Sequence, residues 1–151
     1  MPDVVIADTS CFIILSNINE LNLLKEVYGK IITTPDIVRE FGGNLPDWVI
    51  IKPPADLQKQ QILELQIDRG EASAIALALE LDGSLVIVDD LEARTLAENL
   101  GISITGTLGV IIKAKLNGII PSIKPFIAKI KKTNFRISTI LEQLALSQAG
   151  E

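Results

Sequence analysis

Acidic residues follow two apolar segments of the 151-residue chain, at positions 4–7 and 84–88. Asp8 comes directly after the first segment, and Asp89 and Asp90 come directly after the second. Continuous apolar segments with β-branched residues are typical of strands buried on both faces of a parallel sheet. Ligands of open α/β sheets bind beyond the carboxyl ends of the strands. The three acids are therefore predicted to lie at a binding site.

Two further acids belong to predicted helices. Glu40 lies beside the apolar stripe of a helix expected from Pro35 to about Phe41. Glu71 opens an alanine-rich helix expected over residues 72–81, where the helix dipole favours an anion. Each has a simpler interpretation, Glu40 as a surface charge and Glu71 as a helix cap. Both could also converge with the strand-end acids at one edge of the sheet.

The residues that the chain lacks narrow the chemistry of such a site. There is no histidine, which excludes Ser-His-Asp and Cys-His catalysis and most zinc sites. Carboxylates alone favour hard cations such as Mg²⁺ or Mn²⁺, which activate water and clamp phosphodiester oxygens. Without a cation the carboxylates would repel one another. Arg94, one turn after the Asp89–Asp90 pair, could be a basic partner of that pair in place of a cation.

Composition favours one compact domain, predicted over residues 1–148 with a polar tail at 149–151. Hydrophobic residues make up 48% of the chain, and the mean hydropathy is +0.37. No segment has the length of a membrane span, and no secretion signal is recognised. The single cysteine, Cys11, excludes an internal disulfide, is expected in the core, and fits a cytoplasmic location.

Charge is unevenly distributed in this protein of net charge −5. Residues 1–98 hold 17 acidic and 7 basic residues, whereas residues 99–141 hold seven basic residues and no acid. The basic segment could be a phosphate-binding face, with Lys113 and Lys115 as candidate nucleic-acid contacts, or a solvated lysine-rich helix surface. The sequence leaves both interpretations open.

The elements alternate along the chain in a way that predicts a parallel sheet with helices on both faces. Strands are expected at 4–7, 30–33, 48–51 (a short edge strand), 84–88 and 102–105. Helices are expected at 11–17, 20–27, 35–41, 56–65, 72–81, 91–100, 106–116, 122–132 and 138–146. The fold class is therefore α/β, with four to five parallel strands.

Four short motifs occur in a fixed order: Asp8-Thr9-Ser10, Thr34-Pro35 with Glu40, Gly70-Glu71-Ala72, and Val88-Asp89-Asp90 with Ala93-Arg94. Their order and spacing resemble the PIN-domain family of Mg²⁺/Mn²⁺-dependent ribonucleases over nearly the whole chain. Residues 101–118 resemble one prokaryotic subfamily of these proteins.

The resemblance implies a three-layer α/β/α sandwich with a carboxylate cluster that holds metal. It implies catalytic roles for four acids: Asp8, Glu40, Glu71 and Asp90. Metal ligands would come from Asp8, Glu71, Asp89 and Asp90, with Asp89 or Asp90 as the main ligand of that pair. Thr9, Ser10 and Arg94 would support the site. Many family members are toxins of toxin–antitoxin pairs and form homodimers, so RNA, a small antitoxin and a second copy are the expected partners.

Two departures from the family pattern keep an alternative open. Glu71 stands where many members carry Asp, and Val88 replaces a hydroxyl residue that commonly supports the site. The predicted function is a metal-dependent endoribonuclease, and the alternative is a non-catalytic RNA- or protein-binding module on the same scaffold. A phospho-acceptor domain fits less well, because Ser10 stands where haloacid-type phosphatases need an acid and the acidic pair comes late in the chain.

Overall fold

Five parallel strands form one sheet in the computed structural model, which describes residues 2–151. The strand order is β3-β2-β1-β4-β5, and β1 and β4 pair at the centre with Ala7 opposite Ile87. The strands are β1 (Val4–Ala7), β2 (Ile31–Thr33), β3 (Val49–Ile51), β4 (Ser84–Ile87) and β5 (Ser103–Thr105). The predicted parallel sheet is confirmed with five strands.

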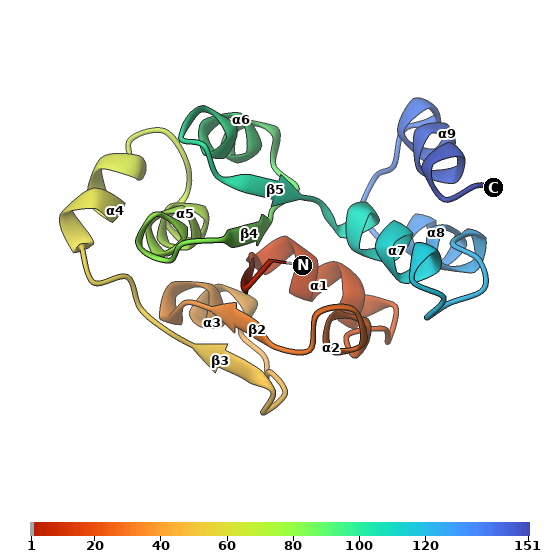
Figure 1. Ribbon diagram of the computed structural model, residues 1–151, viewed down its shortest axis with the longest axis horizontal. Coiled ribbons are helices and arrows are strands. Elements are labelled where there is room, and N and C mark those ends of the chain that lie inside the picture. The colour runs from red at the N-terminus through yellow and green to blue at the C-terminus, as the bar shows by residue number, and fades with distance from the viewer. Residues whose placement is uncertain (1) are drawn as a thin grey trace.

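Helices flank the sheet on both sides (Figure 1). They are α1 (Thr9–Asn17), α2 (Leu23–Tyr28), α3 (Pro35–Phe41), α4 (Leu57–Leu63), α5 (Arg69–Glu80), α6 (Leu91–Asn99), α7 (Thr107–Leu116), α8 (Lys124–Lys131) and α9 (Thr139–Gln148). Helices α4 and α9 lie at opposite ends of the long axis of the molecule. No helix in the described residues has the length and apolar character needed to cross a membrane.

Helix α5 shows how the local sequence sets an element that carries the site. It begins at Arg69, three residues earlier than its alanine-rich stretch predicts, because a capping box starts it. The Asp68 carboxylate accepts from the Glu71 N–H at 2.8 Å, and the Glu71 carboxylate accepts from the Asp68 N–H at 3.3 Å. Residues 70–78 are all buried, so the helix packs closely against its neighbours.

The segment after α9 folds back onto the domain. Ala149 is buried, and the Glu151 carboxylate accepts from the Ser122 hydroxyl at 2.5 Å and from the Ile123 N–H at 2.8 Å. Lys115 Nζ lies 3.3 Å from the same carboxylate. These contacts lower the pKa of Glu151 to about 2, the Ser122 hydroxyl having the largest effect. Residues 149–151, predicted as a polar tail, thus tie α7, α8 and α9 together.

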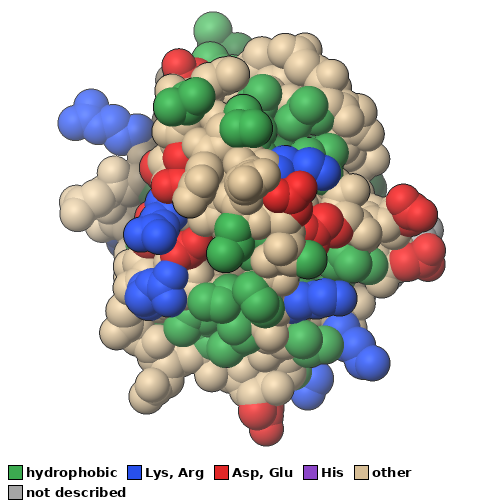
Figure 2. Space-filling view, turned by 90° about the vertical axis from the view of Figure 1, so that its left-hand side faces the viewer, with side chains coloured by type: hydrophobic (Ala, Val, Ile, Leu, Met, Phe, Trp, Pro, Cys, Tyr) green, Lys and Arg blue, Asp and Glu red, His purple; other side chains and the backbone are tan. Residues whose placement is uncertain are grey.

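The end of the molecule that carries α4 exposes hydrophobic side chains among acidic and basic ones (Figure 2). Leu57, Ile62 and Leu65 are the most exposed of these on and next to α4. Scattered apolar side chains are ordinary on protein surfaces, so this end does not by itself indicate a binding site.

Candidate active site

The predicted acids meet at the carboxyl edge of the sheet, around the central pair of strands. Asp8 follows β1, and its backbone N–H donates to the Ile87 carbonyl of β4 at 3.0 Å. Helices α3 and α5, which pack against each other, contribute Glu40 and Glu71. We call the six carboxylates gathered here the acidic cluster: Asp8, Glu40, Asp68, Glu71, Asp89 and Asp90.

Asp8 lies deepest in the acidic cluster. It is only 3% exposed, and its Oδ1 has no hydrogen-bond partner. Burial first, and then the charges of Asp68, Glu40 and Asp89, raise the pKa of Asp8 to about 7, although a hydrogen bond from the Thr9 backbone N–H lowers it in part. A buried carboxylate oxygen without a partner is costly, so this position calls for a compensating proton or cation.

Two more acids of the cluster have raised pKa values. Burial, followed by the charges of Asp68, Asp8 and Asp90, raises the pKa of Glu71 to about 8. The pKa of Glu40 is also raised, first by burial, although a hydrogen bond from Thr9 lowers it in part. The carboxylates therefore interact with one another, as expected for acids brought together without a basic residue between them.

The position of Glu40 depends on Gly70. A Cβ atom at residue 70 would lie 1.7 Å from Glu40 Oε1, so the carboxylate lies directly against the glycine. Thr9 Oγ1 donates to the same Oε1 at 3.1 Å. Glu40, which the sequence alone could not distinguish from a surface acid, thus reaches the acidic cluster across the first turn of α5.

A chain of buried hydroxyls holds α3 and α5 together beneath the acidic cluster. The Thr34 hydroxyl lies 2.6 Å from Ser73 Oγ, which donates to the Gly70 carbonyl at 2.7 Å. Thr34 also caps α3 by accepting from the Ile37 N–H at 3.3 Å. The sequence indicated Thr34 only as part of the Thr34-Pro35 motif, and the one signal for Ser73 is that it is a polar residue in an otherwise apolar stretch of α5.

The Asp89–Asp90 pair has different partners from the one expected. Asp89 accepts from the Thr107 N–H at 2.8 Å and from the Thr107 hydroxyl at 2.6 Å. Asp90 caps α6 by accepting from the Ala93 N–H at 3.0 Å. Arg94 forms no ion pair in residues 2–151 and donates instead to the Val88 carbonyl at 2.9 Å. The expectation that Arg94 pairs with these acids is therefore wrong.

The remaining predicted residues lie at varying distances from the acidic cluster. Ser10 is half-buried in the first turn of α1, next to Thr9. Cys11 is fully buried, which raises the pKa of its thiol and confirms a core position. Asp68 and Thr107 were missed, although Asp68 stands two residues before the Gly70-Glu71 motif that identified α5.

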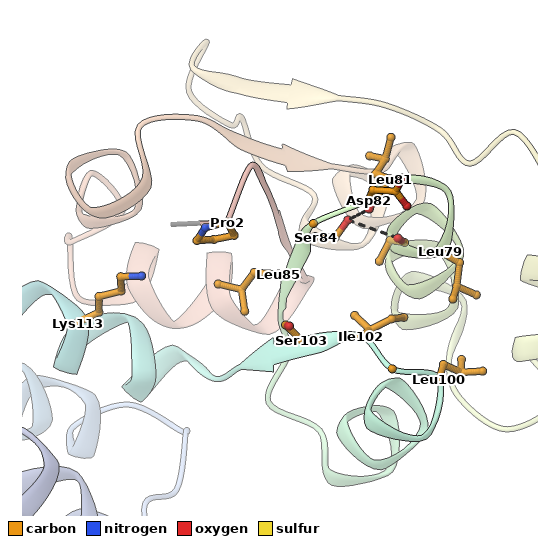
Figure 3. A pocket seen from close by; sticks show the side chains of 13 residues that line it. Pro2, Leu79, Leu81, Asp82, Ser84, Leu85, Leu100, Ile102, Ser103 and Lys113 are labelled. Atoms are coloured by element: carbon orange, nitrogen blue, oxygen red, sulfur yellow. Dashed lines mark hydrogen bonds between the residues drawn. The ribbon is translucent and has the colours of Figure 1, made fainter.

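The candidate nucleic-acid lysines do not lie beside the acidic cluster. Lys113 lines a cavity of about 570 Å³ at the opposite edge of the sheet, where Ser84 and Ser103 begin their strands (Figure 3). Its Nζ is 5.3 Å from the centre of the Tyr28 ring. Lys115 Nζ donates to the Ala149 carbonyl at 2.9 Å. Both lysines are engaged in contacts within the fold.

The acidic cluster has the donor chemistry of a hard-cation site, because all of its donors are carboxylate oxygens. The buried, unpartnered Asp8 Oδ1 fits such a cation in particular. Within residues 2–151, no group of three or more acidic or cysteine side chains is arranged so that it could hold a metal ion. The residues present thus fit Mg²⁺ or Mn²⁺ in type, and no ready-made ligand triad occurs in the described part of the chain.

Comparison with known proteins adds one finding. The family model described as "DUF3368: PIN domain" matches residues 4–151. No curated protein matches the chain. The matched range includes all five strands and every residue of the acidic cluster.

Proposed function

Because the chain belongs to the PIN-domain family, we propose that it is a metal-dependent endoribonuclease whose active site is the acidic cluster. The observation that carries the proposal is Asp8. Its carboxylate is buried without a partner for Oδ1, among other acids that raise its pKa. An arrangement that is unfavourable for the fold alone, and that lies at a sheet edge where ligands bind, supports a catalytic role.

The side chains of Asp8, Glu71 and Asp90 would hold the metal ion, and they would have to draw together around it, since they form no ready-made ligand triad. Mg²⁺ or Mn²⁺ bound there would supply positive charge to the phosphodiester and lower the pKa of a bound water. Asp90 uses only Oδ2 to cap α6, whereas both oxygens of Asp89 bond to Thr107. Asp90 is therefore the better ligand of the pair, and Asp89 fixes the start of α7 beside the site.

Glu40 has the features of the group that takes a proton from the attacking water. Thr9 holds Oε1, which leaves Oε2 to accept the proton, and the raised pKa of Glu40 makes it a stronger base than an ordinary carboxylate. The water oxygen forms a bond to phosphorus as the bond from phosphorus to the leaving ribose oxygen breaks. That ribose oxygen then takes up a proton from solvent water, and Glu40 later releases its proton to solvent.

The test is RNA cleavage by the purified full chain with Mg²⁺ or Mn²⁺ and with EDTA, beside the Asp8→Asn variant. We expect metal-dependent cleavage that is lost in the variant while its circular dichroism spectrum is unchanged. If Asp8→Asn cleaves RNA at the wild-type rate, Asp8 has no role in the mechanism. A folded wild type that cleaves none of several RNAs with either metal would favour the non-catalytic binding module. The toxin role, the antitoxin and the homodimer stay predictions from the resemblance.

A further inference from the structure

A second feature lies next to the acidic cluster and has no role in the proposed mechanism. It is a cavity of about 420 Å³ between α6, β5, α7 and α9, which we call the α9 cavity. Its walls are mostly apolar and include Ile104, Leu108, Phe135 and Leu144. Cavities of this size with apolar walls and a few polar groups are typical binding sites for small molecules.

The α9 cavity and the acidic cluster meet at Gly106. A Cβ atom at this residue would lie 2.9 Å from Asp89 Oδ1 and 3.0 Å from Arg94 Nη1. Both of these side chains line the α9 cavity, and Asp89 also belongs to the acidic cluster. A ligand in the cavity would therefore lie beside anything bound at the acidic cluster.

Three polar side chains from different elements line the cavity with donor or acceptor atoms to spare. Thr105 and Gln148 make no side-chain hydrogen bond within residues 2–151, and Arg94 uses only Nη1. The Thr105 hydroxyl has room because residue 109 is glycine, where a Cβ would lie 2.1 Å from Thr105 Oγ1. Such groups can bond to the polar edge of a ligand whose faces contact the apolar walls.

The net charge of the residues lining the α9 cavity indicates which class of ligand fits it. Asp89 and Arg94 are the charged residues among those lining it, and their charges cancel. A phosphate would meet no net positive charge there, and a basic or acidic peptide would meet no opposite charge. A neutral group with flat apolar faces and a polar edge fits best, and a nucleobase has these properties.

We propose that the α9 cavity binds one unstacked base of single-stranded RNA, next to the phosphodiester at the acidic cluster. This inference rests on the proposed function and adds a determinant of sequence preference to it. Phe135 and the apolar walls would contact the faces of the base, and Arg94, Thr105 and Gln148 would bond to its edge. A docked protein helix is less favoured, because it needs an extended groove with repeated anchors rather than a compact cavity.

Two variants of α9 distinguish the effect of a charge inside the α9 cavity from the effect of a charge elsewhere on the same helix. Leu144→Glu places a charge in the cavity wall at a residue that is already 53% exposed, so the fold should tolerate it. Ile140→Glu is the matched control, because Ile140 is 73% exposed on the same helix and does not line the cavity. The readout is the amide NMR spectrum of the full chain during titration with each of the four nucleoside monophosphates in EDTA.

We expect at least one nucleoside monophosphate to shift the amide signals of Gly106, Gly109 and Gln148. Leu144→Glu should weaken that binding at least tenfold, and Ile140→Glu should leave it unchanged. In RNA cleavage, Leu144→Glu should lose base preference at one position next to the cut, whereas Ile140→Glu, outside the cavity, should keep both activity and that preference. Absence of these shifts in the wild type, or equal effects of the two variants, overturns the proposal.

Two further outcomes separate this inference from the proposed function. Nucleotide binding at the cavity without cleavage of any RNA would support the proposed base site and refute the proposed nuclease activity. If cleavage depends on Asp8 but has no base preference, and the protein binds no nucleotide at the cavity, the proposed nuclease activity is supported and the proposed base site is refuted. If light scattering shows that Leu144→Glu, but not Ile140→Glu, breaks a dimer while nucleotides do not bind, the cavity is a protein interface and the base proposal is wrong.

Discussion

Replacing Gly70 with alanine should separate the stability of the fold from the integrity of the site. The new Cβ would lie 1.7 Å from Glu40 Oε1 and 2.8 Å from Glu40 Cδ, so the carboxylate must move away. The backbone needs no change, because Gly70 is an ordinary residue of α5 and does not have a positive φ. The substitution therefore acts on the position of Glu40.

The effect on stability should be small. Alanine is favoured over glycine within a helix by up to about 1 kcal/mol. Against this stands the hydrogen bond from Thr9 to Glu40, worth about 0.5–1.5 kcal/mol. Glu40 is exposed, so its displaced carboxylate can move into water at little cost. The two contributions nearly cancel, and the free energy of unfolding should change by less than about 1 kcal/mol.

The effect on activity should be large. Removing a general base typically lowers the rate by about 10²–10⁴-fold. We expect Gly70→Ala to cleave RNA no faster than Glu40→Ala, and the double variant to be no slower than either single one, since each removes the same carboxylate. In the Glu40→Ala background, Gly70→Ala should raise the free energy of unfolding by up to about 1 kcal/mol, because the clash is gone.

Urea denaturation and RNA cleavage of the four proteins in this cycle test the reasoning. A Gly70→Ala protein that is stable and cleaves at the wild-type rate would refute it, because the contact between Glu40 and Gly70 would then not matter for catalysis. Strong destabilisation that persists in the Glu40→Ala background would point to a clash other than the one with the carboxylate.

Three more predictions follow from the same contacts. In EDTA the pKa of Asp8 is higher in the folded protein than in the unfolded protein. Between about pH 4 and 7 the folded state therefore binds more protons than the unfolded state. The free energy of unfolding consequently falls as the pH rises through that range. Asp8 should contribute up to about 4 kcal/mol of this fall in urea denaturation, and Asp8→Asn should remove that contribution while the fall due to the raised pKa of Glu71 stays. Ser73→Ala should lower the free energy of unfolding by about 1–2 kcal/mol, because the buried Thr34 hydroxyl loses its acceptor. Thermal melts and urea titrations of the variant and the wild type would measure this difference. Glu151→Gln should speed hydrogen exchange at the Ile123 amide, since an amide accepts that bond more weakly than a carboxylate; unchanged exchange would mean that the contact does not hold α8.

The sequence predicted the elements well because their signals are local. Apolar segments, a Thr34-Pro35 helix start and glycines at helix ends each act within a few residues. The predicted edge strand at 48–51 and the helix ending at Phe41 lie within a residue of their observed bounds. Strand-end acids such as Asp8 were found for the same reason, since a parallel sheet fixes where its strands end.

The partners of the site residues could not be predicted, because they lie far apart in the chain. Thr107 is 18 residues from Asp89, yet it donates both hydrogen bonds to the Asp89 carboxylate, whereas the partner that the sequence suggested for the acidic pair was Arg94. Gly70 and Glu40 are 30 residues apart, and nothing local to either reveals their contact. Side-chain contacts between elements depend on packing angles that periodicity does not encode.

The basic segment illustrates a limit of composition as evidence. Lys113 and Lys115 are both on α7, but two residues along a helix turn it by about 200°, so the two side chains leave on opposite sides. One lies over the Tyr28 ring, and the other bonds to Ala149 and Glu151. A count of lysines cannot tell whether they form one face, whereas the helix geometry indicates that these two do not.

The six acids of the acidic cluster are not equally strong evidence for function, because most of them also have a structural role in the fold. Asp68 and Glu71 cap α5, Asp90 caps α6, and Asp89 holds the start of α7. Asp8 stands at the cap position of α1 but makes no side-chain capping bond there, and its Oδ1 is buried without a partner. Stability would improve if this carboxylate were neutral, so selection for folding does not explain it. Asp8 is therefore the residue at which loss of activity can be separated most cleanly from loss of structure, and an Asp8→Asn protein that is more stable and inactive is the outcome that a catalytic role requires.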